Sequence, residues 1–491
     1  MGRSIFATAG MIEFFSLRAS DPSAASRSPM KFSQVTLFAG AILLASCLPH
    51  LFAADERPNI VFIITDQHHA GMMSAAGNPY LETPALDSLA NQGVRFTNAY
   101  VANPVCMPSR VSMATGMMPG RLGVFNNGMK ADIPEHVDEN SLGKLMKRAG
   151  YDTFYGGKTH LAPSLEPRKA GYDKFFKNER DALPDACIEF IETPRKNPFF
   201  VVASFINPHD ICFAFNAYKY LPRRLPLVDE LYKQATQLPL DQLPPLPPNH
   251  NIQTGEPIAI ESSLKVDAIT PAKIIRKEYD ELQWRYYRWI YCRLTERVDS
   301  HIAKILDALK ANELEENTLV LFTADHGDMD AAHGLASKNH FYEESSGVPF
   351  LMRHNGSIPA GVVNDTHLIS TGIDILPTLC DYAGIEIPSH LIGRSLRQIA
   401  EGKELQESRQ YVVSENDIGR MLRSDRYKYC VYIEGNQRES LVDLQKDPGE
   451  LNNLATHPEY QDILYSHQNY LQQWIEESND QEAKSFAISG N

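Results

Sequence analysis

The chain has 491 residues, of which 43% are hydrophobic and 22% are charged, as in an ordinary globular protein. This length allows one large domain and a smaller one, with a sizeable core. The net charge of −14 argues against a nucleic-acid-binding protein, which usually carries a basic face, but it allows an anionic substrate because a pocket can be locally positive. The seven cysteines form no Cys-x-x-Cys pair, so neither a zinc site nor a disulfide scaffold is expected.

Residues 1–54 have the features of an export signal. Met30-Lys31 precedes an apolar run, Val35 to Leu48, that is too short to span a membrane as a mature helix, and Ala53-Ala54 follows. We expect Met30 to be the true start, after an over-extended gene start, and we expect an exported protein, periplasmic or secreted. Leu44-Ala45-Ser46-Cys47 also resembles a bacterial lipobox. A lipid anchor at Cys47, as in an outer-membrane lipoprotein, and an uncleaved membrane anchor are the alternatives.

Three apolar runs rich in β-branched residues predict parallel strands buried on both faces: residues 59–65, 199–205 and 318–323. Each run ends in polar residues, which are Asp66-Gln67, Asn207-Pro208-His209-Asp210 and Asp325-His326. Ligands of open α/β sheets bind outside the carboxyl ends of the strands. The chain therefore has the organisation of an α/β enzyme. Asp66, Gln67, Asp325 and His326 are suitable ligands for one divalent cation of calcium or magnesium type.

The other predicted elements lie between and after these runs. Helices are predicted over 83–90, 109–118, 141–148 and 275–310, and a short strand at 151–155 leads to Gly157-Lys158-Thr159-His160. Residues 222–260 are rich in proline and lack a clear period, so we interpret them as a surface insertion near the mouth of the site. Strand-like runs at 411–413 and 427–432 precede a helical stretch, 457–477. We therefore predict a large domain over 55–390 and a small antiparallel domain over 391–491.

Cys106-Met107-Pro108-Ser109-Arg110, with Thr115-Gly116 further on, places a cysteine just ahead of a predicted helix. Pro108 fits the first helical turn, so Cys106 would lie at the positive end of the helix dipole. Arg110 is four residues further on and can face the same side. A nucleophile, a helix start and a guanidinium suit a tetrahedral oxyanion. A buried structural cysteine is the other interpretation.

This motif resembles the signature of the type I sulfatases, in which the cysteine is oxidised after translation to Cα-formylglycine. The resemblance covers nearly all of the chain after the export signal. Asp66 matches the family's first metal aspartate, and Gln67 stands where many members have a second aspartate. Asp325-His326 resembles the second metal pair. The resemblance implies an alkaline-phosphatase-superfamily fold: a large mixed, mostly parallel α/β sheet between helices, with a small C-terminal antiparallel α+β domain.

Further matches follow in the family's order. Gly157-Lys158-Thr159-His160 resembles its Gly-Lys-x-His element, Pro208-His209 its Pro-His element, and Lys338 the lysine of its downstream block. The segment 443–454 resembles a recurrent C-terminal sulfatase segment. These matches imply that the chain has the family's active site. It departs from the common pattern at Gln67, which is an amide where many members have a carboxylate. The pair Asp-Gln also occurs in choline sulfatases and phosphonate monoester hydrolases, so it does not separate these branches.

The resemblance implies a mechanism. A formylglycine hydrate formed from Cys106 would attack sulfur as the nucleophile. One Ca²⁺, held by Asp66, Gln67, Asp325, His326 and the modified Cys106, would activate it. Arg110, Lys158 and Lys338 would neutralise charge on the sulfuryl oxygens. We assign His209 as the general acid for the leaving oxygen and His160 to the breakdown of the sulfated intermediate.

We therefore predict a sulfuric ester hydrolase of the sulfatase type (EC 3.1.6), acting on a sulfated carbohydrate and matured by a formylglycine-generating enzyme. A choline-sulfatase-like enzyme for small esters is one alternative. A phosphonate monoester or phosphodiester hydrolase of the same superfamily is the second. A sulfate- or glycan-binding protein that keeps an unmodified Cys106 is the third, although no catalytic residue of the motif is missing.

Overall fold

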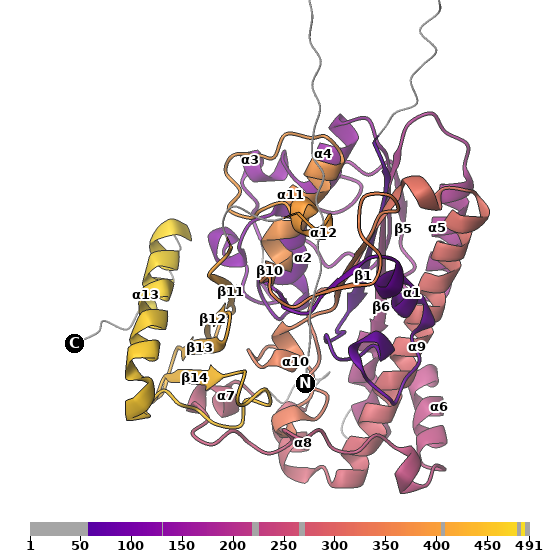
Figure 1. The fold of residues 1–491 in the computed structure, drawn as a ribbon. Helices are drawn as coiled ribbons and strands as arrows, with labels where there is room; N and C mark the ends of the chain where they lie inside the picture. The colour runs from indigo at the N-terminus through magenta and orange to yellow at the C-terminus, as the bar shows by residue number, and fades with distance from the viewer. Residues whose placement is uncertain are drawn as a thin grey trace, which may run out of the picture. The chain divides into compact units, whose positions relative to one another are not determined.

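The computed structural model describes residues 57–129, 131–218, 225–264, 271–403, 408–478 and 483–486. The predicted start at Met30, the signal peptide and the lipobox at Cys47 lie outside the described residues. Residues 55–491 form one compact unit, shown in Figure 1. Among the described helices, none combines the length and the apolar character needed to cross a membrane.

An eight-stranded sheet with the strand order β5-β4-β6-β1-β7-β8-β2-β9 forms the centre of this unit. Its strands are β1 (Asn59–Asp66), β2 (Val94–Phe96), β4 (Asp152–Gly157), β5 (Lys174–Phe176), β6 (Phe199–Pro208), β7 (Thr318–Ala324), β8 (Phe350–Arg353) and β9 (Val362–Asn364). Pairing is parallel from β5 across to β7, and β8 runs antiparallel to both of its neighbours. The predicted mixed, mostly parallel sheet is confirmed.

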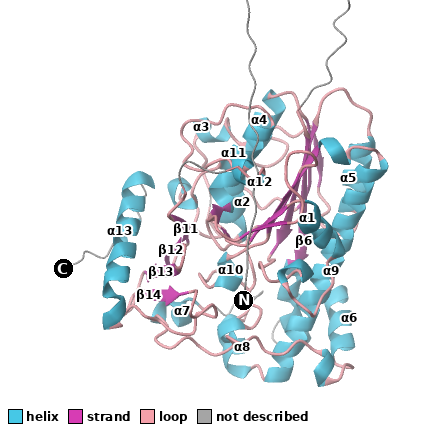
Figure 2. Ribbon diagram, viewed as in Figure 1, coloured by secondary structure: helices cyan, strands magenta, loops and turns pink. Residues whose placement is uncertain are grey.

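Helices cover both faces of the sheet (Figure 2). Because side chains alternate along a strand, Ile60, Phe62 and Ile64 of β1 pack on one side, with α2 (Cys106–Thr115), α4 (Leu142–Arg148) and α11 (Thr371–Tyr382). Val61 and Ile63 pack on the other side, with α1 (Pro84–Gln92), α5 (Leu183–Glu192) and α9 (Glu281–Ala311). The buried, unbroken apolar character of β1 follows from this double coverage.

Two segments differ from their sequence predictions. The helix expected over 275–310 is divided into α8 (Ala272–Glu278) and α9. The division occurs because Asp280 starts a new helix with a capping box, in which its carboxylate accepts from the backbone N–H of Gln283 at 2.8 Å. The proline-rich stretch contains α6 (Pro226–Ala235), which packs on α9, and part of α7 (Ile258–Ser263). It is therefore not structureless, although prolines interrupt its periodicity.

The C-terminal part contains a four-stranded antiparallel sheet: β11 (Tyr411–Glu415), β12 (Gly419–Ser424), β13 (Tyr427–Tyr432) and β14 (Glu439–Asp443). The long helix α13 (Gln461–Ser478) lies beside it (yellow in Figure 1) and buries Leu464, Leu471 and Trp474 against it. The predicted small antiparallel part is confirmed, while the boundary between residues 390 and 391 stays a prediction. The remaining short elements include α3 (Glu135–Asp138), α10 (Glu343–Ser346), α12 (Arg397–Ala400) and the parallel pair β3 (Ala99–Tyr100) and β10 (Ile369–Ser370).

Candidate active site

Four neighbouring strands, β4, β6, β1 and β7, deliver most of the predicted site residues. These strands are parallel to one another, so their carboxyl ends meet at one edge of the sheet. The residues at those ends are Lys158 after β4, His209 after β6, Asp66 and Gln67 at the end of β1, and Asp325 and His326 after β7. The sheet order therefore brings together residues that lie up to 260 positions apart in the chain (Asp66 to His326).

Two glycines permit the close packing at this edge. A Cβ on Gly157, whose φ is +94°, would lie 2.0 Å from the carbonyl oxygen of Ser204 on the adjacent strand. A Cβ on Gly327 would lie 1.9 Å from the carbonyl oxygen of Glu344. A side chain at Gly157 would push β4 away from β6, and one at Gly327 would push the loop after β7 away from α10, which explains why glycine accompanies Lys158 and His326 in the sequence.

Cys106 is the first residue of α2, one position inside the helix rather than ahead of it as predicted. Val105 is the extended N-cap residue, and Pro108 lies in the first turn, where its missing N–H is not needed. Cys106 is 1% exposed and Arg110, one turn later, is 2% exposed. The helix start therefore places both side chains in the same buried region.

The sulfur of Cys106 lies among positive groups. Its Sγ atom is 3.1 Å from Nε2 of His326 and 3.2 Å from Nζ of Lys338. Burial and the carboxylate of Asp66 oppose ionisation, but the charges of Lys158, Lys338 and His326 prevail and hold the pKa of Cys106 well below its usual range. An anionic group at this position is therefore stabilised by its surroundings.

Arg110 holds the two aspartates in place. Its Nε donates to Oδ2 of Asp325 at 2.7 Å, and Nη2 donates to Oδ2 of Asp66 at 3.0 Å. Its Nη1 donates to Oγ of Ser204 at 2.7 Å. Lys158 also pairs with Oδ2 of Asp66. Because these contacts use one oxygen of each carboxylate, Oδ1 of Asp66 and Oδ1 of Asp325 are directed toward other partners.

The arrangement fits a divalent cation. Ligand atoms of Asp66, Cys106, Asp325 and His326 all lie within 4.8 Å of one another. Nδ1 of His326 is 2.8 Å from the carbonyl oxygen of Gly327, a contact in which Nδ1 donates its proton, so Nε2 is the nitrogen that can bind a metal when the ring is neutral. That nitrogen faces Oδ1 of Asp325 at 3.5 Å and Oδ1 of Asp66 at 3.9 Å. Although burial opposes a charged ring, Asp325 raises the pKa of His326. The buried carboxylates therefore favour a positive charge at this position, which a proton on Nε2 or a bound cation would supply.

Gln67 has its amide fixed by Asp328, a residue for which the sequence suggested no role. Nε2 of Gln67 donates to Oδ2 of Asp328 at 2.6 Å, and Oε1 accepts from Nζ of Lys338 at 2.8 Å. The amide oxygen therefore faces the site, as a metal ligand must. Asp328 also accepts from Tyr287 and from the N–H groups of Asp330 and Ser337. Its one signal in the sequence was its place in the polar run after β7.

The two predicted histidines differ in their surroundings. Burial and the positive charges of Lys338 and Lys158 hold the pKa of His209 well below its usual range. No described residue is a hydrogen-bond partner of Nδ1 of His209. His160 follows Lys158 with a φ of +44°, and within the described part of the chain no hydrogen bond or ion pair holds its ring. The catalytic roles of both histidines stay predictions.

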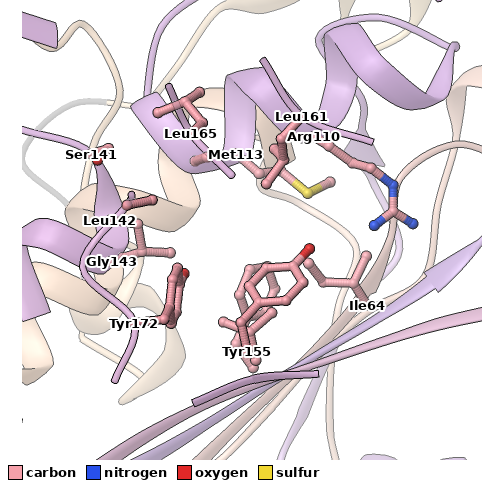
Figure 3. Close-up of a pocket in the computed structure, with 14 residues that line it drawn as sticks. Ile64, Arg110, Met113, Ser141, Leu142, Gly143, Tyr155, Leu161, Leu165 and Tyr172 are labelled. Atoms are coloured by element: carbon pink, nitrogen blue, oxygen red, sulfur yellow. The ribbon is translucent and has the colours of Figure 1, made fainter. Parts of the chain in front are cut away.

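An apolar cavity of about 30 Å³ lies behind Arg110, between α2, α4 and β4 (Figure 3). Figure 3 shows the guanidinium at one edge of this cavity and the rings of Tyr155 and Tyr172 facing it. The lining is mostly aliphatic and aromatic, and neither Lys158 nor Lys338 contributes to it. Because a sulfate group needs hydrogen-bond donors and positive charge, we place the substrate on the side of Cys106, Lys158 and Lys338.

Two solved structures that share this fold are a sulfatase and a phosphonate monoester hydrolase. A 2-O GAG sulfatase superposes with a TM-score of 0.75 and 31% identity, over 89% of this chain and 95% of its own. The phosphonate monoester hydrolase of Agrobacterium radiobacter has the same fold, with a TM-score of 0.69 at 21% identity over 86% of this chain and 96% of its own. The fold is that of the alkaline phosphatase superfamily.

The family follows from the sequence comparisons. Residues 58–385 match the Sulfatase family, and residues 331–477 match the C-terminal region of N-sulphoglucosamine sulphohydrolase. The delta 4,5-hexuronate-2-O-sulfatase of Bacteroides thetaiotaomicron is 33% identical over 453 residues, which cover 87% of this chain and 90% of the relative. The chain belongs to the sulfatase family and is a sulfuric ester hydrolase, as the sequence predicted.

Proposed function

We propose that this sulfatase removes a sulfate group from a sulfated carbohydrate, with a 2-O-sulfated hexuronate as the first candidate. The proposed reaction rests on the position of Cys106. Its sulfur contacts Lys338 and His326 and belongs to the same cluster as the buried Asp66 and Asp325. The names of the relative at 33% identity and of the structure at 31% identity support the sugar class.

The active-site side chains divide into a buried floor and a partly exposed rim. Asp66, Asp325 and His326 are 0% exposed, whereas the side chain of Lys158 is 11% exposed and that of Lys338 is part-buried. A sulfuryl group entering from solvent would meet the two ammonium groups first. Their charge would neutralise its oxygens, most strongly when negative charge accumulates in the transition state.

Cys106 is proposed as the precursor of Cα-formylglycine. Hydrated, that aldehyde would supply the oxygen nucleophile for attack on sulfur. We propose that Asp66, Gln67, Asp325 and His326 would hold the one Ca²⁺ ion that the sulfatase resemblance implies, three of them through oxygen, the donor that Ca²⁺ prefers. When bound, the ion would lower the pKa of the nucleophile and polarise the ester. Arg110 fixes the geometry of this ligand set by occupying the outer oxygens of both aspartates.

His209 and His160 are proposed to move protons. The lysines that depress the pKa of His209 would be partly neutralised by a bound sulfate ester, so its pKa would rise on binding. In that state His209 can give a proton to the leaving sugar oxygen, which is a poor leaving group without it. His160 is proposed to take part in the release of sulfate and the return of the resting enzyme.

Maturation and export are tested separately from activity. We propose that the protein is exported and that a formylglycine-generating enzyme acts on it. Mass spectrometry of the tryptic peptide containing Cys106, from protein recovered by fractionation, would report an aldehyde or a thiol. The most N-terminal peptide of the same digest would report the site at which the N-terminus is cut. An unmodified thiol in fully active protein would contradict the mechanism.

The substrate proposal is tested by comparing turnover of four compounds at equal concentration: a 2-O-sulfated unsaturated uronate disaccharide, N-acetylglucosamine-6-sulfate, choline sulfate and a phosphonate monoester. We expect the highest kcat/KM for a sulfated sugar, and loss of that activity in Cys106→Ala. A preference for choline sulfate or for the phosphonate would overturn the proposal in favour of the corresponding small-ester enzyme.

A further inference from the structure

A second group of potential metal ligands lies outside the active site. His333 belongs to the loop after β7, Glu344 to the first turn of α10, and Glu450 to the segment between β14 and α13. Ligand atoms of the three side chains lie within 4.8 Å of one another. The group therefore connects the large sheet region with the C-terminal part of the chain.

His333 is the first indication that this group binds something. The residue is 0% exposed, and its ring stacks on that of Tyr342 with centroids 3.8 Å apart. The backbone of Asn251 lies near the ring, but among the described residues neither Nδ1 nor Nε2 has a hydrogen-bond partner of normal geometry. A buried imidazole normally has at least one partner, because leaving it without one costs free energy.

The two carboxylates provide the second indication. Oε1 of Glu344 accepts from Asn249 at 2.8 Å, whereas Oε2 of Glu344 has no hydrogen-bond partner in the part of the chain that the structure describes. Glu450 pairs with Lys428 at 2.8 Å, but Lys428 is shared with Glu343 at 2.6 Å. Lys428 thus pairs with two carboxylates, and no ion pair to Glu344 occurs among the described residues. The free carboxylate oxygen of Glu344 lies within reach of the imidazole of His333.

We propose that His333, Glu344 and Glu450 bind one Zn²⁺ ion. One imidazole nitrogen and two carboxylate oxygens, with a water as the fourth ligand, form a tetrahedral donor set that suits zinc, with ligand distances of about 2.0–2.2 Å. Ca²⁺ prefers oxygen ligands throughout and is less suited to His333. The partial exposure of Glu344 provides the approach from solvent.

The ion would stabilise the loop that carries Lys338. That loop contains five non-glycine residues with positive φ: Asp330, Ala331, His333, Ser337 and Asn339. Such conformations persist where surrounding contacts hold them. His333 lies five residues before Lys338, so a metal that ties it to Glu450 would anchor the loop to the C-terminal part. The site is structural, and its occupancy does not depend on the reaction at Cys106.

Metal analysis tests this proposal. Protein dialysed against Ca²⁺ and trace Zn²⁺ is measured by inductively coupled plasma mass spectrometry. We expect one zinc ion per chain in the wild-type protein. Asp325→Asn, which lacks a proposed active-site ligand, should keep this zinc, whereas His333→Gln and Glu344→Gln should lose it. His467→Gln is the matched control, since His467 is also buried but has hydrogen bonds to Ser424 and Ile463.

Thermal unfolding provides a readout that does not depend on recovering every variant in quantity. Zn²⁺ should raise the Tm of chelator-treated wild-type protein and of His467→Gln, and should leave the Tm of Glu344→Gln unchanged. If wild-type protein contains no zinc and its Tm does not change when zinc is added, then His333, Glu344 and Glu450 share a proton and bind no metal. Zinc lost in Asp325→Asn but kept in His333→Gln would assign the ion to the active site. Either result overturns the proposal. The first leaves the proposed sulfatase site untouched, whereas the second would also replace its proposed Ca²⁺ with zinc; the loss of turnover expected in Cys106→Ala tests the reaction independently of both.

Discussion

The ammonium group of Lys338 lies 3.2 Å from the sulfur of Cys106, although 232 residues separate the two in the chain. The same ammonium donates to the amide oxygen of Gln67 at 2.8 Å. A positive charge fixed between the nucleophile position and a proposed metal ligand is placed to stabilise charge on a sulfuryl oxygen.

Replacing Lys338 should therefore affect the chemical step. For Lys338→Met we expect kcat/KM to fall by roughly 10²- to 10³-fold, the loss typical for one preorganised donor, with the fold unchanged by circular dichroism. Steady-state kinetics on the best sugar sulfate measures it. Lys233→Met, at a lysine that is 74% exposed, is the control and should retain wild-type activity. Equal kcat/KM in both variants would remove Lys338 from the mechanism.

Arg110 is predicted to contribute both stability and metal affinity. Arg110→Met leaves Asp66 and Asp325 without their shared guanidinium, so the free energy of unfolding in chelator should fall by roughly 3–5 kcal/mol. Because a bound cation would replace part of the lost charge, added Ca²⁺ should restore more stability to this variant than to wild type. Denaturant unfolding with and without Ca²⁺ measures both effects. Arg297→Met removes a pair between side chains that are 35% and 64% exposed and should cost less than about 1 kcal/mol.

Calcium removal should inactivate the enzyme reversibly. Chelation is expected to abolish turnover and lower Tm, and added Ca²⁺ should restore both. In Asp325→Asn the Tm should no longer respond to Ca²⁺, because a buried carboxylate ligand is missing. Asp307→Asn alters an exposed helical aspartate and should respond like wild type. Full activity in metal-free protein would contradict a metal role for this cluster.

The two histidines are predicted to respond differently to the leaving group. His209→Ala should lower kcat for a sugar sulfate by roughly 10²- to 10⁴-fold but should affect an aryl sulfate far less, since a phenolate leaves without a proton. His160→Ala should lower turnover of both substrates to a similar extent, because its proposed step follows departure of the alcohol. The ratio of the two kcat values in each variant is the measurement. A His209→Ala variant equally impaired on both substrates would argue that His209 binds sulfate rather than donating a proton.

Asp328 is predicted to act through Gln67. Asp328→Ala removes the acceptor that fixes the amide nitrogen of Gln67 at 2.6 Å, so the amide oxygen should lose its fixed direction. We expect a roughly 10- to 100-fold weaker affinity for Ca²⁺, as for other residues that orient metal ligands. Calorimetric titration of chelator-treated protein measures it, and Asp307→Asn serves again as the control. Unchanged affinity would show that Gln67 does not bind the ion.

The sequence predicted the strands and the ligands at their ends because both depend on local patterns. Runs such as residues 59–65 are apolar on both faces, which indicates a buried parallel strand, and Asp66 and Asp325 follow such runs. The prediction was weaker at helix boundaries. Cys106 proved to lie inside α2, and a capping box at Asp280 divided a helix whose apolar stripe seemed continuous, because caps depend on single side-chain hydrogen bonds.

The residue types and their order along the chain were thus determined by the sequence itself, including the positions that make up the proposed metal and sulfate sites. Only the tertiary structure decided which of them meet. The strand order β4-β6-β1-β7 brings Lys158, His209, Asp66 and Asp325 to one edge, and the packing of α2 and the loop after β7 adds Cys106 and Lys338. The support from Asp328 and the unpartnered imidazole of His333 could not be read from local pattern, because each arises from contacts between segments distant in the chain.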